Sequence, residues 1–457
     1  MKILVFLLPV LIGLLFCLLV STRLGHFWLF VAISPGIGIG ITSILFFLWS
    51  LCFYPRFEIG VYEGLEVLLF GGLLIVSIRR HLFFRPNLQI KINGVELLFG
   101  IVLVIALFFF FYRFLIYVAA NPLGGWDAWA RWNARARYLL LGDAITWRNV
   151  FSAYVSQADY PFLLSGFIAR CWVLLGREYV FVPVVTAGIF SISIILVLVL
   201  SLAALRNLSV GLFGGFILAS LPHFAWSSAT LLADVPLALY FLVSIYFLSQ
   251  FFFNPKHTDN LLMVGITAGL ALWTKNEGAS LVLSIFIVLL VCLLRLKVPF
   301  RQSIQMIFTL IMGLFPFLLL FLGYKFFIAP SGFLFRDVQS IPLRILAVER
   351  YRIIGSAVWN ELFTFGGWKL PFPLMMIGYS ILVGVRSLNP AQKNGALAAG
   401  AVLMMIYLQY LAVFVITPYD LEWQIMTSLT RLYNQLLPGV LLTLLLIIKI
   451  PFSVSED

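Results

Sequence analysis

Long apolar runs recur along nearly the whole chain, separated by short polar segments. A run of about 18 or more apolar residues can cross a bilayer as a helix, and the pattern predicts about thirteen such spans. Residues 160–175 form a shorter apolar run, which we expect to lie at the membrane surface or dip into it. The predicted spans are 3–21, 28–53, 58–78, 95–119, 179–203, 208–225, 231–252, 261–275, 279–296, 304–328, 367–386, 395–417 and 434–450.

Composition agrees with a membrane protein. Hydrophobic residues make up 63% of the 457 residues, and mean hydropathy is +1.08, whereas soluble domains average roughly 45–50% apolar residues. The net charge of +12 comes from few residues and gives no reason to expect nucleic-acid binding. The four cysteines and four histidines are scattered without the spacing of a zinc site. We expect an all-α polytopic membrane protein.

Basic residues in the short loops predict its orientation. With thirteen spans they all fall on one side, which is the cytoplasm if the positive-inside rule holds. The N-terminus and the long segments 120–178 and 329–366 are then external. The loop residues are Arg23, Arg79, Arg80, Arg85, Lys91, Arg206, Lys256, Arg295, Lys297, Arg301, Arg386, Lys393 and Lys449. The external segments contain arginines suited to phosphate contacts, namely Arg131, Arg135, Arg137, Arg148, Arg170, Arg177, Arg336, Arg344, Arg350 and Arg352.

A charged, tryptophan-rich stretch opens the first external segment, directly after Gly124-Gly125. Asp127 at a water-poor rim could act as a general base; alternatively, it is a carboxylate favoured by the start of a helix. Trp126 suits the lipid interface. Arg131 and Arg135 lie four residues apart, so they could clamp a phosphate or extend to lipid headgroups.

Four more ionisable residues are assigned to the same face. Asp234 precedes an apolar span, and Arg431 enters one, so each needs a partner or a water-filled cavity. Lys275 and Glu277 flank a tight turn, where they could bind phosphate, pair with each other or serve only as turn residues. We expect Asp127, Asp234, Lys275 and Arg431 to share one external chamber.

In these features the region from about residue 95 to 450 resembles the C-type (GT-C) glycosyltransferases, which use polyprenyl-phosphate sugars. They include protein mannosyltransferases, aminoarabinose transferases and galacturonosyltransferase-like enzymes. Asp127 occupies the place of the acidic residue that is their expected catalytic base. Many members carry a second, adjacent acid where this chain has Ala128, so no metal ligand is carried over. The other matching segments are Asp159-Tyr160-Pro161-Phe162-Leu163, Asp234-Val235-Pro236-Leu237 and Gly269-Leu270-Ala271-Leu272-Trp273-Thr274-Lys275.

The resemblance implies a GT-C-like catalytic domain over 93–457, with residues 1–92 as appended transmembrane helices. It implies inverting transfer of a sugar from a polyprenyl-phosphate donor to a hydroxyl of a glycan, lipid or protein acceptor. Asp127 would be the base, and Trp126, Arg131, Arg135, Asp234, Lys275, Glu277 and Arg431 would bind substrate. No cofactor is required, although a divalent cation is compatible. The expected site is the periplasmic side of a bacterial inner membrane. The alternatives are a transporter or flippase of lipid-linked sugars and a polysaccharide polymerase or ligase.

Overall fold

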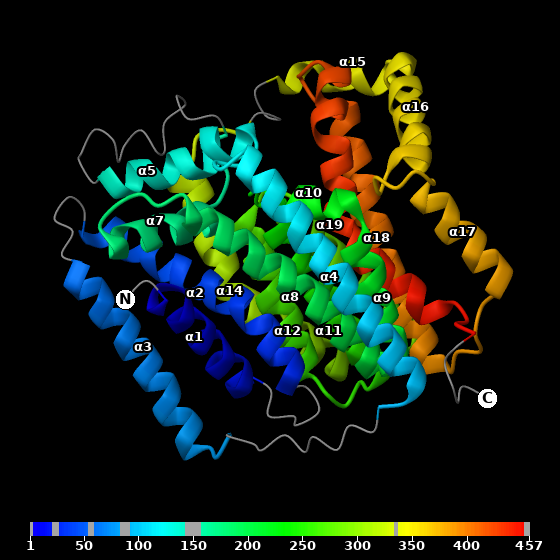
Figure 1. Ribbon diagram of the computed structural model, residues 1–457, viewed down its shortest axis with the longest axis horizontal. Coiled ribbons are helices and arrows are strands. Elements are labelled where there is room, and N and C mark those ends of the chain that lie inside the picture. Colours follow the sequence, from blue (N-terminus) through cyan, green and yellow to red (C-terminus); the bar gives the residue numbers. More distant parts are fainter. Residues whose placement is uncertain are drawn as a thin grey trace.

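The computed structural model describes residues 3–20, 27–53, 59–82, 92–141, 157–332 and 337–451, and these ranges are built from helices (Figure 1). Within them, the only extended pairing is an isolated bridge between Val385 and Ile448. Five arginines and lysines used in the sequence argument lie outside the described residues: Arg23, Arg85, Lys91, Arg148 and Arg336.

Helices and short helical turns make up most of the described residues. In chain order they are α1 (Leu4–Val20), α2 (Phe27–Phe53), α3 (Ile59–Arg79), α4 (Gly94–Ala120), a π-helical turn (Ala128–Asn133), α5 (Ala134–Leu141), α7 (Leu163–Leu175), α8 (Phe181–Leu205), α9 (Leu208–Ser220), α10 (Pro222–Ala229), α11 (Asp234–Phe253), α12 (Asp259–Thr274), α13 (Gly278–Arg295), α14 (Phe300–Phe327), a 3-10 turn (Val338–Ser340), α15 (Ile341–Leu346), α16 (Val348–Thr364), α17 (Phe372–Val383), α18 (Pro390–Ile416) and α19 (Leu421–Ile447).

Nine of the described helices are long and apolar enough to cross a membrane, namely α2, α3, α4, α8, α11, α13, α14, α18 and α19. The bent pair α9–α10 makes ten if it counts as one span. The chain is therefore an all-α polytopic membrane protein. The expected number of thirteen is not reached by length, because α1, α12 and α17 have fewer than 18 residues.

The predicted span 208–225 is broken. Helix α9 ends at Ser220 and α10 begins at Pro222, with the two axes bent by 66°. A residue before proline is disfavoured in the helical region, and Leu221 is extended, with ψ 119°. Pro222 then starts the next helix. At this first position a backbone N–H would have no acceptor within the helix, so proline loses no helical hydrogen bond.

Helix α11 forms the centre of the bundle, and nearly all its side chains are buried. It packs against α8, α12, α18 and α19. Its first residue, Asp234, consequently lies where several helices meet. Helices α15, α16 and α17 lie toward one edge of the molecule and α3 toward the opposite edge (Figure 1).

The apolar run near 160–175 forms α7, which neighbouring helices cover, and its expected position at the membrane surface stays a prediction. Helix α7 has every residue from Leu163 to Trp172 buried because it packs against α2 and α5. The preceding π-helical turn has a more superficial face: Trp129 is exposed, whereas Trp132 is buried.

A buried ion pair joins α3 to α7. The Arg170 guanidinium donates to both carboxylate oxygens of Glu66, at 2.5 and 2.6 Å, and to the backbone oxygen of Val5 at 2.8 Å. Tyr62 also bonds to Glu66. The helices expected to form an appended unit thus share polar and apolar contacts with the rest of the bundle, and the division at residue 92 remains a prediction.

Candidate functional site

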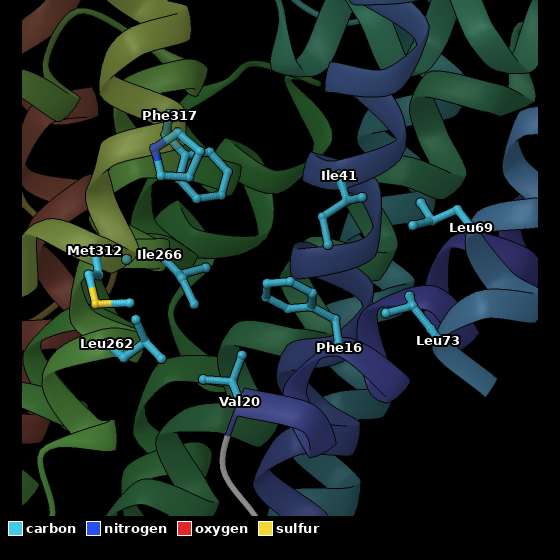
Figure 2. Close-up of a pocket in the computed structure, with 11 residues that line it drawn as sticks. Phe16, Val20, Ile41, Leu69, Leu73, Leu262, Ile266, Met312 and Phe317 are labelled. Carbon is cyan, nitrogen blue, oxygen red and sulfur yellow. The ribbon is translucent and has the colours of Figure 1, made fainter. Parts of the chain in front are cut away.

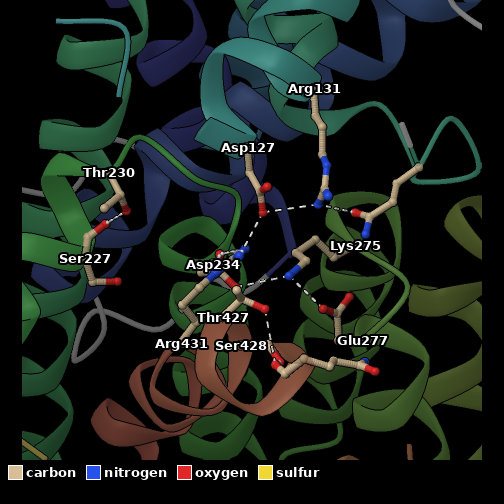
Figure 3. A network of polar contacts seen from close by, with 12 residues as sticks. Asp127, Arg131, Ser227, Thr230, Asp234, Lys275, Glu277, Thr427, Ser428 and Arg431 are labelled. Carbon is tan, nitrogen blue, oxygen red and sulfur yellow. Dashed lines mark hydrogen bonds and ion pairs between the residues drawn. The ribbon is translucent and has the colours of Figure 1, made fainter. Parts of the chain in front are cut away.

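Residues from four separate segments of the chain form an ion-pair network (Figure 3). Asp127 and Arg131 project from the segment after α4, and Arg431 faces them from α19. Asp234 begins α11. Lys275 and Glu277 come from the turn between α12 and α13. The network contains three cations (Arg131, Lys275, Arg431) and three carboxylates (Asp127, Asp234, Glu277).

Asp234 is the central acceptor of this network. Its Oδ1 accepts from Lys275 Nζ at 3.0 Å and from the amide of Gln435. Its Oδ2 accepts from Arg431 Nε and Nη2, at 3.2 and 2.8 Å. Both oxygens are thus engaged and the residue is only 2% exposed. Asp234 is suited to holding two cations in position, and it has little capacity left for a substrate.

Arg431 connects the two aspartates. Besides Asp234, it donates through Nη1 to Asp127 Oδ2 at 2.8 Å. Asp127 Oδ2 also lies 3.1 Å from Arg131 Nη1. Among the described residues, no donor engages the other oxygen, Asp127 Oδ1. Asp127 therefore has one anchored oxygen and one available for a ligand.

A glycine pair directs Asp127 into the network. Gly124 has a φ of +79°, a conformation that costs other residues energy. The next amide, Gly125 N–H, donates to the backbone oxygen of Thr230 at 3.0 Å. This bond ties the loop to the end of α10, and the side chain of Asp127 makes no helix-capping bond. Asp127 thus stands at the start of the helical turn and pairs locally with Arg131, and its contact with Arg431 is the long-range one.

We expect Gly124→Ala to destabilise the protein by about 1–3 kcal/mol because of backbone strain and crowding. An added Cβ would lie 2.6 Å from Thr230 O and 2.8 Å from Ala128 Cβ. Thermal unfolding in detergent measures the effect. Gly100→Ala in α4 is the matched control, because a Cβ there meets nothing within 4 Å. Equal stability of the two variants would contradict the assigned role of Gly124.

Two buried polar atoms at the network lack a partner among the described residues: Arg131 Nε and Glu277 Oε2. Lys275 Nζ lies 2.6 Å from the other oxygen, Glu277 Oε1. A buried donor or acceptor without a partner is costly. An anionic oxygen would satisfy Arg131 Nε, and a hydroxyl would satisfy Glu277 Oε2.

Two other candidate residues lie outside the network of ion pairs. Trp126 is 58% exposed and lies beside Arg131, whose guanidinium carbon is 5.4 Å from the centre of the indole. Arg135 is buried, donating to Tyr324 at 3.1 Å and stacking 3.7 Å from the centre of the Phe162 ring. Burial lowers the pKa of Arg135. The structure places Arg135 among protein groups, away from the expected phosphate clamp.

Most other arginines predicted to meet phosphate have protein partners. Arg137 makes a bidentate pair with Glu178 at 2.6 and 2.7 Å, and this bond raises its pKa. Arg344 pairs with Asp337 and Arg352 with Glu349. Arg350 donates to the backbone oxygens of Phe414 and Thr417, and Arg177 lies over the Tyr179 ring. Their positions reflect local charge and hydrogen-bond pairing.

Sequence reasoning missed the uncharged members of the site. Gln435 bonds to Asp234 and accepts from Tyr410 at 2.6 Å, and Gln157 accepts from Arg131 at 2.7 Å. Gln435 follows Arg431 by one helical turn, and this spacing is a signal that could have identified it. No comparable signal marks Gln157 or Tyr410.

A second polar cluster borders the network. Asp159 Oδ2 accepts from Asn276 at 2.7 Å and from Lys325 at 3.2 Å. Asn276 lies between Lys275 and Glu277 in sequence. The cluster therefore joins the 157–162 segment to the same turn that supplies those two network residues.

A cavity of about 480 Å³ lies beside Arg431. Helices α10 and α19 supply most of its lining, and α4 contributes Tyr117. The cavity and the network share Arg431. A ligand in the cavity would thus be adjacent to the carboxylates that Arg431 holds.

A second cavity, of about 400 Å³, is apolar (Figure 2). It lies between α1, α2, α3, α12 and α14, and none of its lining residues belongs to the network. Phe16, Ile41, Leu69 and Phe317 are among the side chains around it. Its surface offers hydrocarbon contacts and no charged group.

Among the described residues, the carboxylates of the network do not form a cluster of metal ligands. Within the described ranges, no group of three His, Cys, Asp or Glu side chains is placed to hold one ion. The carboxylates of the network are each paired with Lys or Arg. A role for a divalent cation thus remains an untested prediction.

No family model matches the chain, and no curated protein or solved structure is significantly similar to it.

Proposed function

We propose that this protein is a membrane glycosyltransferase that transfers a sugar from a polyprenyl-phosphate donor to an acceptor hydroxyl. The observation that carries the proposal is the position of Asp127. One of its oxygens is held by Arg431 and Arg131, while the other faces no described donor, and the cavity adjoins Arg431. A carboxylate with an open oxygen beside buried cations has the parts needed for a base and a phosphate site.

In the proposed reaction, the acceptor oxygen attacks the anomeric carbon and Asp127 takes the hydroxyl proton. The bond between that carbon and the phosphate oxygen breaks, and polyprenyl phosphate leaves with the bonding pair. Direct displacement inverts the anomeric centre. Arg131, Lys275 and Arg431 would stabilise the charge on the leaving phosphate, an effect that is strong where water is excluded.

The equal numbers of cations and carboxylates in the network would link phosphate binding to the release of the base. The cations are neutralised by carboxylates, so an entering phosphate must compete for them. Asp127 is the more easily displaced aspartate, because one oxygen makes all its ion-pair contacts, whereas Asp234 uses both oxygens. A phosphate that takes over Arg131 and Arg431 would release Asp127 to act as a base.

The location of the reaction belongs to the same proposal. We place the site on the periplasmic face of a bacterial inner membrane, on the basis of the basic short loops. A thirteen-span topology would add α1, α12, α17 and the bent pair α9–α10 to the nine longer helices. Glycans, lipids or proteins would supply the acceptor hydroxyl.

A transporter of lipid-linked sugars is the second candidate, favoured by one observation. Helices α9 and α10 form a span bent by 66°, and α10 borders the cavity next to the network. Transporters often build substrate sites from broken helices. Here the bend has a local cause at Pro222.

Proteoliposomes separate these two functions. A panel of radiolabelled polyprenyl-phosphate hexoses and pentoses is supplied with a cell-envelope glycan and lipid fraction as acceptor. The proposal predicts release of polyprenyl phosphate and covalent labelling of the acceptor. Movement of intact donor between leaflets without bond formation would overturn it in favour of transport.

We expect Arg131→Gln to weaken binding of polyprenyl monophosphate by about tenfold or more, since a hydrogen bond to a charged group contributes about 1.5–3 kcal/mol. Affinity is measured with the purified protein in detergent. Arg352→Gln is the control, because Arg352 is exposed and, among the described residues, pairs with Glu349. Unchanged affinity in a folded Arg131 variant would exclude this residue from the phosphate site.

A further inference from the structure

The wall of the cavity beside Arg431 combines aromatic surface with oriented hydrogen-bonding groups. Tyr117 and Trp226 line it together with His223, Thr427 and Thr430. Trp226 is 39% exposed. An aromatic face can cover the C–H surface of a ring, while polar groups select the hydroxyls around its edge.

The two threonines present oxygen lone pairs. Thr430 uses its hydroxyl proton on Glu361 Oε1, at 2.5 Å. Thr427 donates to the backbone oxygen of Trp423 at 2.9 Å. A hydroxyl that has already donated can still accept. This part of the wall is therefore suited to ligands that carry O–H donors.

His223 supplies the complementary donor. The backbone N–H of Gly366 donates to His223 Nδ1 at 3.0 Å, and the backbone N–H of His223 donates to the backbone oxygen of Gly366 at 3.3 Å. Because Nδ1 accepts, the neutral ring carries its proton on Nε2. Gly366 has a φ of +102°, and a Cβ on Gly367 would approach His223 Cδ2 to 2.9 Å. The glycine pair thus allows the backbone to hold the imidazole closely.

We infer that this cavity binds a neutral sugar ring through Trp226, His223, Thr427 and Thr430. The ring would be that of the transferred sugar or that of a glycan acceptor, and it would lie next to the Arg431–Asp127 pair. The inference rests on the proposed function in naming a sugar as the ligand. None of these four residues belongs to the ion-pair network, although Arg431 of the network also lines the cavity.

Binding is tested first without turnover. A panel of methyl glycosides of hexoses and pentoses is titrated into the purified protein, with tryptophan fluorescence and saturation-transfer NMR as readouts. We expect saturable binding of at least one glycoside, weakened fivefold or more by Thr430→Val and lost in Trp226→Leu. Matched controls are Thr364→Val, an exposed threonine that donates to Asn360 O, and Trp359→Leu, an exposed tryptophan on α16.

Saturable binding that Thr430→Val and Trp226→Leu leave unchanged would overturn the assignment, as would no binding by any glycoside. His223→Phe offers a second test, since it removes the donor while keeping an aromatic ring of similar size.

Turnover assays then identify the source of the sugar. A raised KM for the polyprenyl-phosphate donor in Thr430→Val identifies the transferred sugar, and a raised KM for the acceptor identifies the acceptor glycan. Active transfer with both KM values unchanged overturns the cavity inference and leaves the proposed function intact. The alternative outcome is a protein that shows no transfer activity but binds a glycoside in a way that depends on Thr430 and Trp226. This result would support sugar binding in the cavity and contradict the proposed function.

Discussion

Asp127→Asn is expected to lower the rate of sugar transfer by about 10²–10⁴-fold, the usual contribution of a positioned general base. Asparagine has almost the same shape, so the fold should be retained. The substitution changes three cations and three carboxylates into three cations and two carboxylates. Binding of polyprenyl monophosphate should therefore stay equal or become tighter while turnover is lost.

Both quantities can be measured on one preparation, as single-turnover transfer and as equilibrium binding in detergent. Asp420→Asn is the matched control: Asp420 is exposed and caps α19 by accepting from Trp423 N–H, a role that asparagine also performs well. Transfer at the wild-type rate in Asp127→Asn would refute the assignment of the base. Loss of phosphate binding together with turnover would indicate a structural role for Asp127.

Glu66→Gln is expected to reduce the free energy of unfolding by about 3–5 kcal/mol, because it leaves a buried cation without its counter-ion. Arg170 is 0% exposed, and Glu66 supplies both oxygens of its ion pair. In the ion-pair network, by contrast, Lys275 and Arg431 each contact two carboxylates, so losing one leaves the other. Removing a carboxylate should thus cost more stability in the Glu66–Arg170 pair than in the ion-pair network.

Unfolding in detergent, followed by temperature or denaturant, measures this effect. Glu63→Gln on the same helix is the control, since Glu63 is exposed. The double variant Glu66→Leu with Arg170→Met should recover most of the stability, because apolar replacements of a buried ion pair are often neutral or stabilising. A loss below about 1 kcal/mol in Glu66→Gln, as for a surface pair, would show that α3 is energetically separate from α7 and favour an appended unit.

The helical membrane architecture and several members of the polar network could be predicted from the chain. Apolar runs of spanning length have few stable alternatives, since a bilayer leaves no partner for unpaired backbone groups. Asp234 and Arg431 stand out for a related reason: a charge beside hydrocarbon requires compensation. The structure joins them directly at 2.8 Å.

Features that depend on which helices become neighbours could not be read from the chain. Arg131 and Arg135 look alike in sequence, yet one joins the network and the other is buried against Phe162. The sequence also does not show that the apolar segment of α7 is covered by α2 and α5. In each case, burial depends on contacts between distant segments.

By itself, the sequence determined that this is a polytopic helical membrane protein and that a few charged residues must find partners, because transfer into the bilayer penalises unpaired charges and backbone groups. Only the tertiary structure decided which partners they have. Packing of α11 against α12 and α19 brings Asp234 to Lys275, Arg431 and Gln435. The loop at Gly124-Gly125, which packs against Thr230, then directs Asp127 to the same arginine, Arg431. Such pairings depend on distances of a few ångströms between residues that lie 41 to 304 positions apart, which helix periodicity does not encode.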